Sequence, residues 1–293
     1  RQRLRAGLVV TEVALALVLL IGAGLMLQSL RNLRSADKGF NDEGVLTVRV
    51  PLADDRYGTK ERRHAFYQEL LTRAEGLPGV QAAAMALLLP LSQRSWEVGV
   101  LPDHIPFDQE KQESVLFNIV SPGYFETMGV TLLDGSVFTG SERDETEPVA
   151  VIDETMAAKF WPGDRAVGKR ITIELAPEST NERPIPLYRT VIGVVKNVRH
   201  YQLATPSRIQ VYVPMSQQLA RWGATLSLIL RTSVPPMSLL PTVAREIEAM
   251  DPAVPPTSAR PLSEYVAADL STSRAMGALL AVFGTLALVL SAV

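Results

Sequence analysis

The stretch that decides the fold runs from Val45 to Leu89 and reads VLTVRVPLADDRYGTKERRHAFYQELLTRAEGLPGVQAAAMALLL. Apolar and polar residues alternate over 45–52, a pattern that is typical of a half-buried strand. A second apolar segment over 80–89 predicts another strand, and residues 60–75 between them predict a helix. The stretch therefore predicts a βαβ-type unit.

The predicted helix has a start signal, a buried face and a stop signal. Thr59 is a suitable N-cap, because its hydroxyl can accept a hydrogen bond from a backbone N–H of the first turn. Leu77-Pro78-Gly79 ends the helical pattern. Apolar side chains recur at the spacing of one helix face, and the predicted core face consists of Phe66, Leu70, Ala74 and Leu77.

A similar unit returns near the C-terminal end of the sequence. Residues 210–214 and 226–232 predict strands, residues 240–250 predict a helix that stops before Asp251-Pro252, and 257–261 leads onward. Two such units separated by a long stretch predict an α+β fold with a split ferredoxin-like sheet and an insertion.

The expected insertion, residues 115–205, is rich in strand signals. Ser121-Pro122-Gly123 predicts a short helix with proline at its first position, ending at Gly129. Asp153 is expected to cap another helix. Residues 176–187 contain several prolines and polar residues and predict an exposed hairpin loop. The predicted strands of this β-rich subdomain are 148–152, 169–174 and 190–195.

Both ends of the sequence are apolar. Residues 6–30, AGLVVTEVALALVLLIGAGLMLQSL, contain one charged residue, and as a helix they span roughly 37 Å, enough to cross a hydrocarbon core of about 30 Å. Residues 276–293 reach roughly 27 Å, the lower limit for a span. We therefore expect two flanking transmembrane helices. The expected division is 1–38 (first helix and stalk), 39–114 (core subdomain, first half), 115–205 (insertion), 206–261 (core subdomain, second half) and 262–293 (stalk and a truncated second helix).

Arginines before the first apolar segment predict its orientation. Arg1, Arg3 and Arg5 lie directly before it, and basic residues next to a span favour the cytoplasmic side. Long loops cross the membrane largely regardless of their charge. Residues 39–261 are therefore expected outside the cytoplasm, and the chain is expected to be part of a longer membrane protein.

The composition excludes several classes of function. The 293 residues include no cysteine and three histidines, so thiolate metal sites and cysteine nucleophiles are excluded. The net charge is −2, with none of the basic excess of a nucleic-acid-binding protein. Neither a P-loop nor a G-x-S-x-G or H-E-x-x-H motif occurs. We expect no enzymatic activity, no cofactor and no nucleic-acid partner.

Glu12 is the single charged residue in the first apolar segment. An ionised carboxylate at bilayer depth costs about 3 kcal/mol and normally faces a partner, so Glu12 is a candidate coupling residue. The alternative places Glu12 near the headgroups, neutralised by a neighbouring arginine. Small residues favour close packing of membrane helices, and the candidate packing residues are Gly22, Gly24, Gly277 and Ala281.

Other polar residues favour ordinary structural roles. His200 lies between Arg199 and Tyr201, but an exposed or half-packed loop histidine explains it better than a functional site. The acidic run 142–147 lacks the spacing of a calcium loop and is interpreted as a solvated turn.

A succession of short motifs resembles FtsX-like ABC-type permeases, and more specifically MacB-type exporters and the duplicated orphan permeases of Acidobacteria. The resemblance covers the whole chain. The motifs are EVALALVLLIGAGLMLQSL with Asp37-Lys38-Gly39-Phe40 and Val45-Leu46-Thr47, then Val120–Phe125 with Met128-Gly129, Val149–Glu154, Phe160–Gly163 with Val167–Ile171, and Val191–Val195.

The resemblance implies a bacterial inner-membrane protein with a two-subdomain periplasmic core domain between the first and second of four spans. It implies that a separate cytoplasmic ABC ATPase hydrolyses ATP, and that its conformational change reaches the periplasmic domain through the spans, a process called mechanotransmission. It also implies a homodimer or pseudo-dimer of permease modules in contact with membrane lipid, and a periplasmic substrate or partner protein, as in efflux.

Two functions follow from these observations. The favoured one is a non-catalytic permease component that couples a cytoplasmic ATPase to work on a periplasmic substrate or partner. The alternative is a membrane-anchored sensor whose outer domain binds a ligand and signals inward through its helices. A membrane-tethered hydrolase fits least well, because no catalytic arrangement was found.

Overall fold

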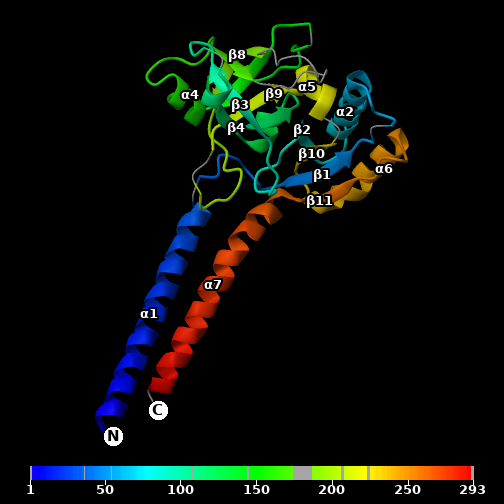
Figure 1. Cartoon of the computed structure of the whole chain (residues 1–293). Helices are drawn as coiled ribbons and strands as arrows, with labels where there is room; N and C mark the ends of the chain where they lie inside the picture. The colour runs from blue at the N-terminus through cyan, green and yellow to red at the C-terminus, as the bar shows by residue number, and fades with distance from the viewer. Residues whose placement is uncertain are drawn as a thin grey trace. The chain divides into compact units, whose positions relative to one another are not determined.

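The computed structural model describes residues 2–35, 37–53, 55–106, 108–143, 145–173, 187–205, 208–222 and 225–291. The chain divides into two compact units: Lys38–Tyr265, and a second unit made of Arg1–Asp37 and Val266–Val293. The first unit is a domain of mixed helices and strands, and the second consists of long helices (Figure 1). The α+β class predicted from the sequence is confirmed.

One part of the domain is a four-stranded antiparallel arrangement in the order β11-β1-β10-β2. Helix α2 (Lys60–Glu75) connects β1 to β2, and α6 (Leu240–Met250) lies between β10 and β11. The first and last strands of the domain are therefore neighbours. The strands are β1 (Val45–Pro51), β2 (Val80–Ala86), β10 (Thr225–Thr232) and β11 (Thr257–Pro261).

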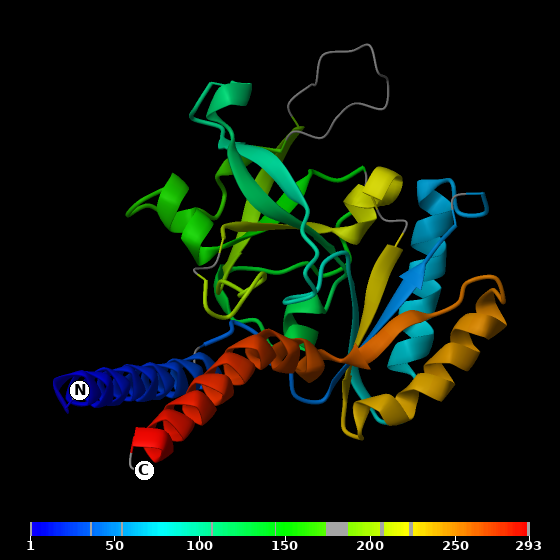
Figure 2. The same ribbon diagram turned by 60° about the horizontal axis from the view of Figure 1, so that its bottom comes forward.

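Every second side chain of these strands contributes to the apolar core. Leu46, Val48 and Val50 of β1 are fully buried and belong to the same apolar cluster as residues of α2 and α6. Because successive side chains of a strand point to opposite faces, the residues between them face away from this cluster. The ribbons of α2 and α6 lie beside these strands in Figure 2. The helices and β10 contribute Phe66, Leu70, Val243, Ile247, Leu226, Leu228 and Leu230.

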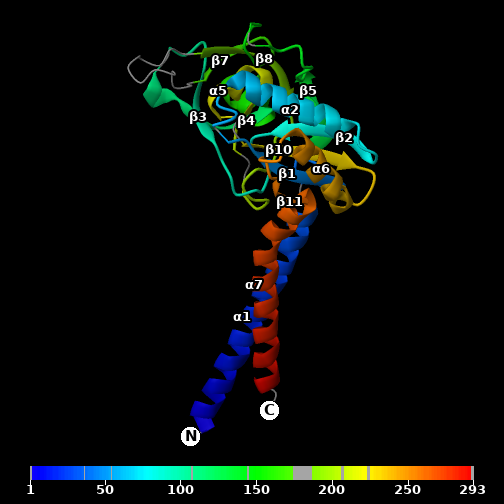
Figure 3. The ribbon, with the colours of Figure 1, turned by 90° about the vertical axis from the view of Figure 1, so that its right-hand side faces the viewer.

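The other part of the domain is a closed ring of strands. The pairings β4–β3, β3–β7, β7–β8, β8–β6, β6–β9 and β9–β4 return to their starting point. Closure leaves these strands without a free edge. Strands β3, β4, β7 and β8 of this ring are labelled in Figure 3. One pairing, Ala86 with Val120, joins the ring to β2. The ring strands are β3 (Glu97–Pro102), β4 (Glu113–Val120), β6 (Val149–Asp153), β7 (Arg170–Ile173), β8 (Leu187–Val195) and β9 (Gln210–Pro214).

The ring strands lie between residues 97 and 214, and the insertion expected at 115–205 stays a prediction. The ring includes β3, which the sequence did not predict, and β9, which the sequence grouped with the second half of the core subdomain. Alternating apolar residues indicate that a strand is half-buried, but they do not indicate its neighbours. A further short strand, β5 (Leu132–Gly135), pairs with β8.

Several predicted elements are confirmed with their caps. Helix α2 covers the predicted residues, and Thr59 Oγ1 accepts a hydrogen bond from Arg62 N at 3.4 Å. Helix α6 also covers its predicted range. Helix α4 (Glu154–Phe160) begins after Asp153, whose Oδ1 accepts from Met156 N at 3.0 Å.

The predicted start of the first short helix was wrong. Helix α3 (Tyr124–Met128) begins after Gly123, which has a φ of +78° and forms the N-cap. Pro122 therefore lies outside the helix, because the left-handed glycine turns the chain before the first helical residue. The predicted hairpin loop at 176–187 falls outside the described residues, except Leu187, which begins β8.

The second unit contains α1 (Gln2–Ser35) and most of α7 (Leu262–Ser291). A Cβ added at Gly284 would lie 3.0 Å from Leu20 Cδ2 and 3.4 Å from Leu20 N, so the two helices approach closely there. Among the described residues, the segment Leu262–Ala287 is long and apolar enough to cross a membrane, judged by length and composition. The apolar segment found in α1, Leu17–Leu33, is shorter, so a span by α1 stays a prediction.

Tyr67 gives a test of how the four-stranded part is held together. This fully buried residue donates from its OH to Val50 O at 3.0 Å and accepts from Leu226 N at 3.1 Å. Tyr67→Phe leaves both backbone groups without this partner, so we expect the free energy of unfolding to fall by about 1–3 kcal/mol. Urea unfolding followed by circular dichroism measures the change. Tyr188→Phe is the control, because Tyr188 is 41% exposed; an equal loss in both variants would contradict this account.

Candidate functional site

The first and last strands of the domain form the most direct candidate for transmitting motion. β1 pairs with β11 through Leu46 with Pro261 and Thr47 with Arg260. Thr47 is fully buried, and its Oγ1 donates to Arg260 O at 2.9 Å. β11 continues directly into α7, and β1 follows the end of α1 after nine residues. A displacement of either helix would thus be delivered to adjacent strands of one sheet.

Residues 38–44, which we call the lead-in segment, are docked on the domain at several points. Gly39 has a φ of +76°, and a Cβ there would lie 1.9 Å from Asn197 O. Arg199 N donates to Lys38 O at 3.0 Å, and Asn41 N donates to Met128 O at 2.8 Å. The lead-in segment is therefore fixed both to the loop after β8 and to α3.

Arg231 of β10 strengthens this docking. Its guanidinium donates to Thr127 O at 2.8 Å and to Glu43 O and Asn41 O at 3.1 Å each. Partial burial lowers the pKa of Arg231 from its ordinary value, and three carbonyl oxygens replace part of the lost hydration. Arg231 thus ties the lead-in segment, α3 and the centre of the four-stranded part together.

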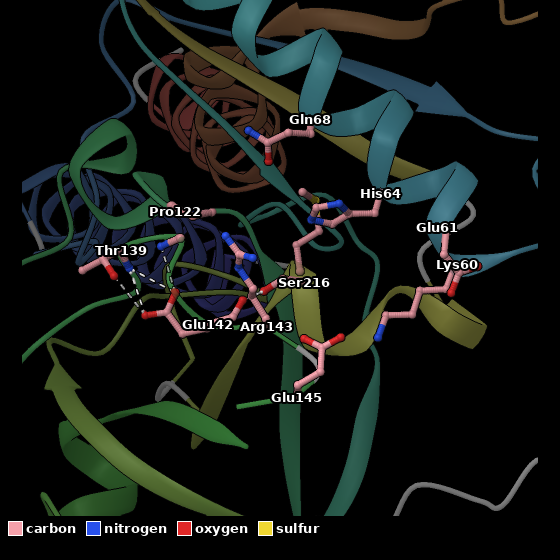
Figure 4. Close-up of a pocket in the computed structure, with 12 residues that line it drawn as sticks. Lys60, Glu61, His64, Gln68, Pro122, Thr139, Glu142, Arg143, Glu145 and Ser216 are labelled. Carbon is pink, nitrogen blue, oxygen red and sulfur yellow. Dashed lines mark hydrogen bonds between the residues drawn. The ribbon is translucent and has the colours of Figure 1, made fainter. Parts of the chain in front are cut away.

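A groove of about 620 Å³ lies between α2, α5 (Met215–Trp222) and the loop around residues 139–145 (Figure 4). This volume falls in the range of ligand sites. The lining combines polar and apolar surface and carries both signs of charge; its polar residues include Lys60, Glu61, His64, Arg143 and Glu145.

The loop that borders the groove is held by its own hydrogen bonds. The Glu142 carboxylate accepts from Gly140 N at 2.8 Å and Thr139 N at 3.1 Å. Ser216 Oγ of α5 donates to Glu142 O, and Gln217 Nε2 donates to Arg143 O at 3.0 Å. The groove wall is therefore positioned by α5. The acidic run of the sequence serves here as a structured turn.

His200 is a buried structural residue. It is 6% exposed, and its Nε2 lies 2.7 Å from Arg94 O, an arrangement in which the protonated Nε2 of the neutral ring donates. Burial lowers the pKa of His200 to about 4. The expectation of an exposed or half-packed histidine was wrong, because sequence neighbours did not reveal that the loop folds back on residues 91–94. The backbone O of His200 also accepts from Leu91 N at 2.7 Å.

The residues predicted as coupling or packing sites lie on α1 and α7. The side-chain environment of Glu12 and the surroundings of Gly277 are outside the described part of the structure. A Cβ at Gly22 or Gly24 would meet nothing within 4 Å in this chain. The close helix approach is at Gly284, which the sequence analysis did not single out. The roles of all five residues, including the half-buried Ala281, therefore stay predictions.

The described residues include no cluster of three or more histidine, aspartate or glutamate side chains that could hold a metal ion. Asp153, the most deeply buried carboxylate among them, accepts hydrogen bonds from Met156 N and Gln210 N at 3.0 Å each. Burial raises the pKa of Asp153, and these donors act against that shift. Its position between α4 and β9 gives it a structural role.

The model of the family described as "MacB-like periplasmic core domain" matches residues 6–250. The chain belongs to this family. The lead-in segment, the β1–β11 pair and the groove are thus features of a MacB-like domain.

Three solved structures are similar to the chain. The periplasmic region of MacB from Actinobacillus actinomycetemcomitans is 16% identical, with a TM-score of 0.49, covering 80% of this chain and 95% of that one. The extracellular domain of the noncanonic ABC-type transporter YknZ from Gram-positive bacteria is 14% identical, with a TM-score of 0.45, covering 73% and 100%. A domain of a putative permease protein from Porphyromonas gingivalis is 17% identical, with a TM-score of 0.43, covering 76% and 92%. A search of curated proteins finds no match.

Gly39 and Gly163 form a matched pair for testing the docked lead-in segment. Both have positive φ, +76° and +78°, but a Cβ at Gly163 would meet nothing within 4 Å. Gly163→Ala should lower the free energy of unfolding by about 1 kcal/mol, the cost of the left-handed backbone alone. Gly39→Ala adds the clash with Asn197 O, so we expect about 2–4 kcal/mol. Urea unfolding compares the two; equal losses would mean that the lead-in segment is not docked as described.

His200 predicts a pH dependence of stability. Because its pKa is lower in the folded state than the ordinary value of 6.5, the unfolded chain binds more protons between about pH 4 and 6.5. Stability should therefore fall on acidification through this window, by up to about 3 kcal/mol from this residue. Unfolding of the wild type and of His200→Gln at pH 7.5 and 4.5 isolates the contribution. His104→Gln, at an exposed position, is the control; identical pH slopes for wild type and His200→Gln would refute the assignment.

Proposed function

We propose that this chain is a non-catalytic permease component, which couples a cytoplasmic ABC ATPase to an extracytoplasmic domain acting on a substrate or partner protein. The observation that carries the proposal is the pairing of β1 with β11, which links the two chain ends of the domain. In this proposal α1 and α7 both cross the inner membrane, with the N-terminus in the cytoplasm and residues 39–261 outside.

The proposed route of coupling follows the docked segments. A movement of α1 reaches the lead-in segment, which contacts α3, the loop after β8 and, through Arg231, the β10 strand. A movement of α7 reaches β11 and, through the Thr47 hydrogen bond, β1. Both routes end in the same four strands, so the domain would move as one body. Glu12 is proposed to transmit movement within the membrane.

We further propose that the four strands with α2 and α6 are a ferredoxin-like subdomain that is split by an insertion. The strand order β11-β1-β10-β2, with one helix in each β-α-β half, supports this assignment. The pairings of β3 and β9 favour an insertion that runs from β3 to β9. The groove beside α2 borders both parts and is the proposed position for a periplasmic substrate or partner.

Packing against a second permease module is the proposed role of the small residues in α1. Gly22 and Gly24 have no neighbour within 4 Å of a Cβ position in this chain, and Leu17, Val18 and Ile21 are each more than half exposed. Small residues allow close approach of membrane helices. Gly277 and Ala281 are proposed to contribute to the same packing from α7, and membrane lipid would cover the remaining apolar side chains.

The test is binding to, and stimulation of, a cytoplasmic ATPase. The full-length protein is reconstituted with the ABC ATPase encoded beside its gene, and ATP hydrolysis is measured with and without the permease. We expect co-purification and at least a severalfold change in hydrolysis rate. Glu12→Gln should reduce that change while leaving membrane insertion, measured by alkaline extraction, as in the wild type.

Two outcomes would count against the proposal. Absence of both binding and stimulation would reject the permease function. Binding to a histidine kinase encoded nearby, with no ATPase partner, would support a sensor instead. Wild-type stimulation by Glu12→Gln would reject a coupling role for Glu12 and leave the headgroup location standing.

A further inference from the structure

A small cavity lies on the face of the four strands that points away from α2 and α6. Arg49 and Ser227 line it and are cross-strand partners on β1 and β10. They alternate with core residues such as Val48 and Leu228, so they project from the opposite face. The cavity is about 130 Å³, which is well below the 300–1,000 Å³ typical of drug-sized ligands. It can hold a small group and not a large molecule.

The charged side chains that line this cavity are all positive among the described residues. Arg49, Arg94 and Arg260 line it together with several hydroxyl groups, and among the described residues no carboxylate does. None of the three arginines forms an ion pair within the described part of the chain. Three cations around one small space repel one another, more strongly where water is partly excluded. A bound anion would offset this repulsion.

Arg260 has a buried donor that the protein leaves unused. Its Nε is buried and has no hydrogen-bond partner among the described residues. Buried donors are nearly always paired, so an orphaned one indicates a missing acceptor. The guanidinium carbon lies 3.6 Å from the ring centroid of Tyr265, a cation–π contact that fixes the plane of the group. Arg260 is therefore held in place but not neutralised.

A β-bulge and a side-chain hydrogen bond position other residues that line the cavity. The register between β1 and β11 shifts between Thr47 and Arg49, and Ser258 at this bulge has a φ of +48°. Bulges re-aim side chains and occur near binding sites, and strained residues cluster at ligand sites. At the edge of the cavity that Arg94 lines, the His200 ring forms a hydrogen bond with Arg94 O and so positions the loop that carries Arg94.

We propose that Arg49, Arg94 and Arg260 form a binding site for a phosphate group. Guanidinium groups bind phosphate through two parallel hydrogen bonds, and the hydroxyls of Ser227 and Ser258 add further donors. A phosphate fits the small volume, and its charge matches three unpaired cations better than a carboxylate does. This inference concerns the domain alone and does not rest on the proposed coupling function.

Two sources can supply such a group: a phospholipid headgroup or a soluble phosphate compound. Tyr265, which lines the cavity, lies in the first turn of α7, whose following residues belong to the candidate membrane span. Occupancy of the site would stabilise the position of Arg260 and Tyr265, and hence the start of α7. The experiment separates the two sources by presenting each one alone.

The test uses the full chain purified in a phosphate-free maltoside detergent at constant ionic strength. Calorimetry measures binding of inorganic phosphate, glycerol 3-phosphate and short-chain phosphatidylglycerol, and thermal unfolding measures the stabilisation. Arg49→Gln and Arg94→Gln remove one charge each from the cavity. Arg245→Gln is the matched control, because Arg245 is exposed on α6. Arg94 is exposed too, so its variant is expected to fold even if Arg49→Gln does not.

We expect phosphate-bearing ligands to bind the wild type and Arg245→Gln equally, and to bind Arg49→Gln and Arg94→Gln at least tenfold more weakly. Without ligand, the two cavity variants should unfold at the same or a higher temperature than the control, because repulsion is relieved. A lipid that binds at least tenfold tighter than both soluble ligands identifies a headgroup site, and equal affinities identify a soluble one. No binding by any ligand, or equal weakening in Arg245→Gln, would overturn the proposal.

Discussion

Backbone hydrogen bonds between β1 and β11 join the two places where the polypeptide enters and leaves its folded domain. Without this pairing, the lead-in segment and the start of α7 would be attached to the domain at separate places. With it, they attach to adjacent strands, and the buried hydroxyl of Thr47 adds a side-chain bond to the same junction. The bulge at Ser258 lies within this pair, whereas Gly39 and Arg231 hold the lead-in segment that precedes β1.

The closed ring gives the domain a second, differently built part. Its strands pair all around, so its stability does not depend on the four-stranded part covering a free edge. One strand pairing and the docked lead-in segment connect the parts. The groove beside α2 lies where the loop of the ring meets a helix of the four-stranded part.

Helices and helix caps were predictable from the sequence where the residues that form them lie close together along the chain. The helix over 60–75 and the cap at Asp153 depend on residues within one turn of each other, and both are confirmed. Pairing partners were not predictable, because β9 carries the same alternation whether it joins β10 or β4. The start of α3 was misplaced because Pro122 favours a first turn, whereas the positive φ of Gly123 ends the preceding segment.

The candidate site residues also differ in whether the sequence alone could identify them. Glu12 stood out because a charge in an apolar run is visible in the sequence alone. Gly39 and Arg231 could not be identified as docking residues, since their partners lie 104 to 190 positions away along the chain. The three arginines of the cavity come from β1, a loop and β11, and only the fold brings them together. His200 looked polar and exposed because its flanking residues are polar, and its burial comes from a distant loop.

The position of β10 between β1 and β2 has a consequence for synthesis. Strands β1 and β2 do not pair with each other, and β10 lies between them. The three-stranded arrangement β1-β10-β2 therefore cannot form until β10 has been synthesised. At roughly 5–20 residues per second, the interval between β2 and β10 lasts on the order of 10 to 30 seconds. All ring strands are synthesised within that interval, because they lie between β2 and β10 in the sequence. The ring can therefore fold first, and the four-stranded part, which is continuous with α1 and α7, closes last.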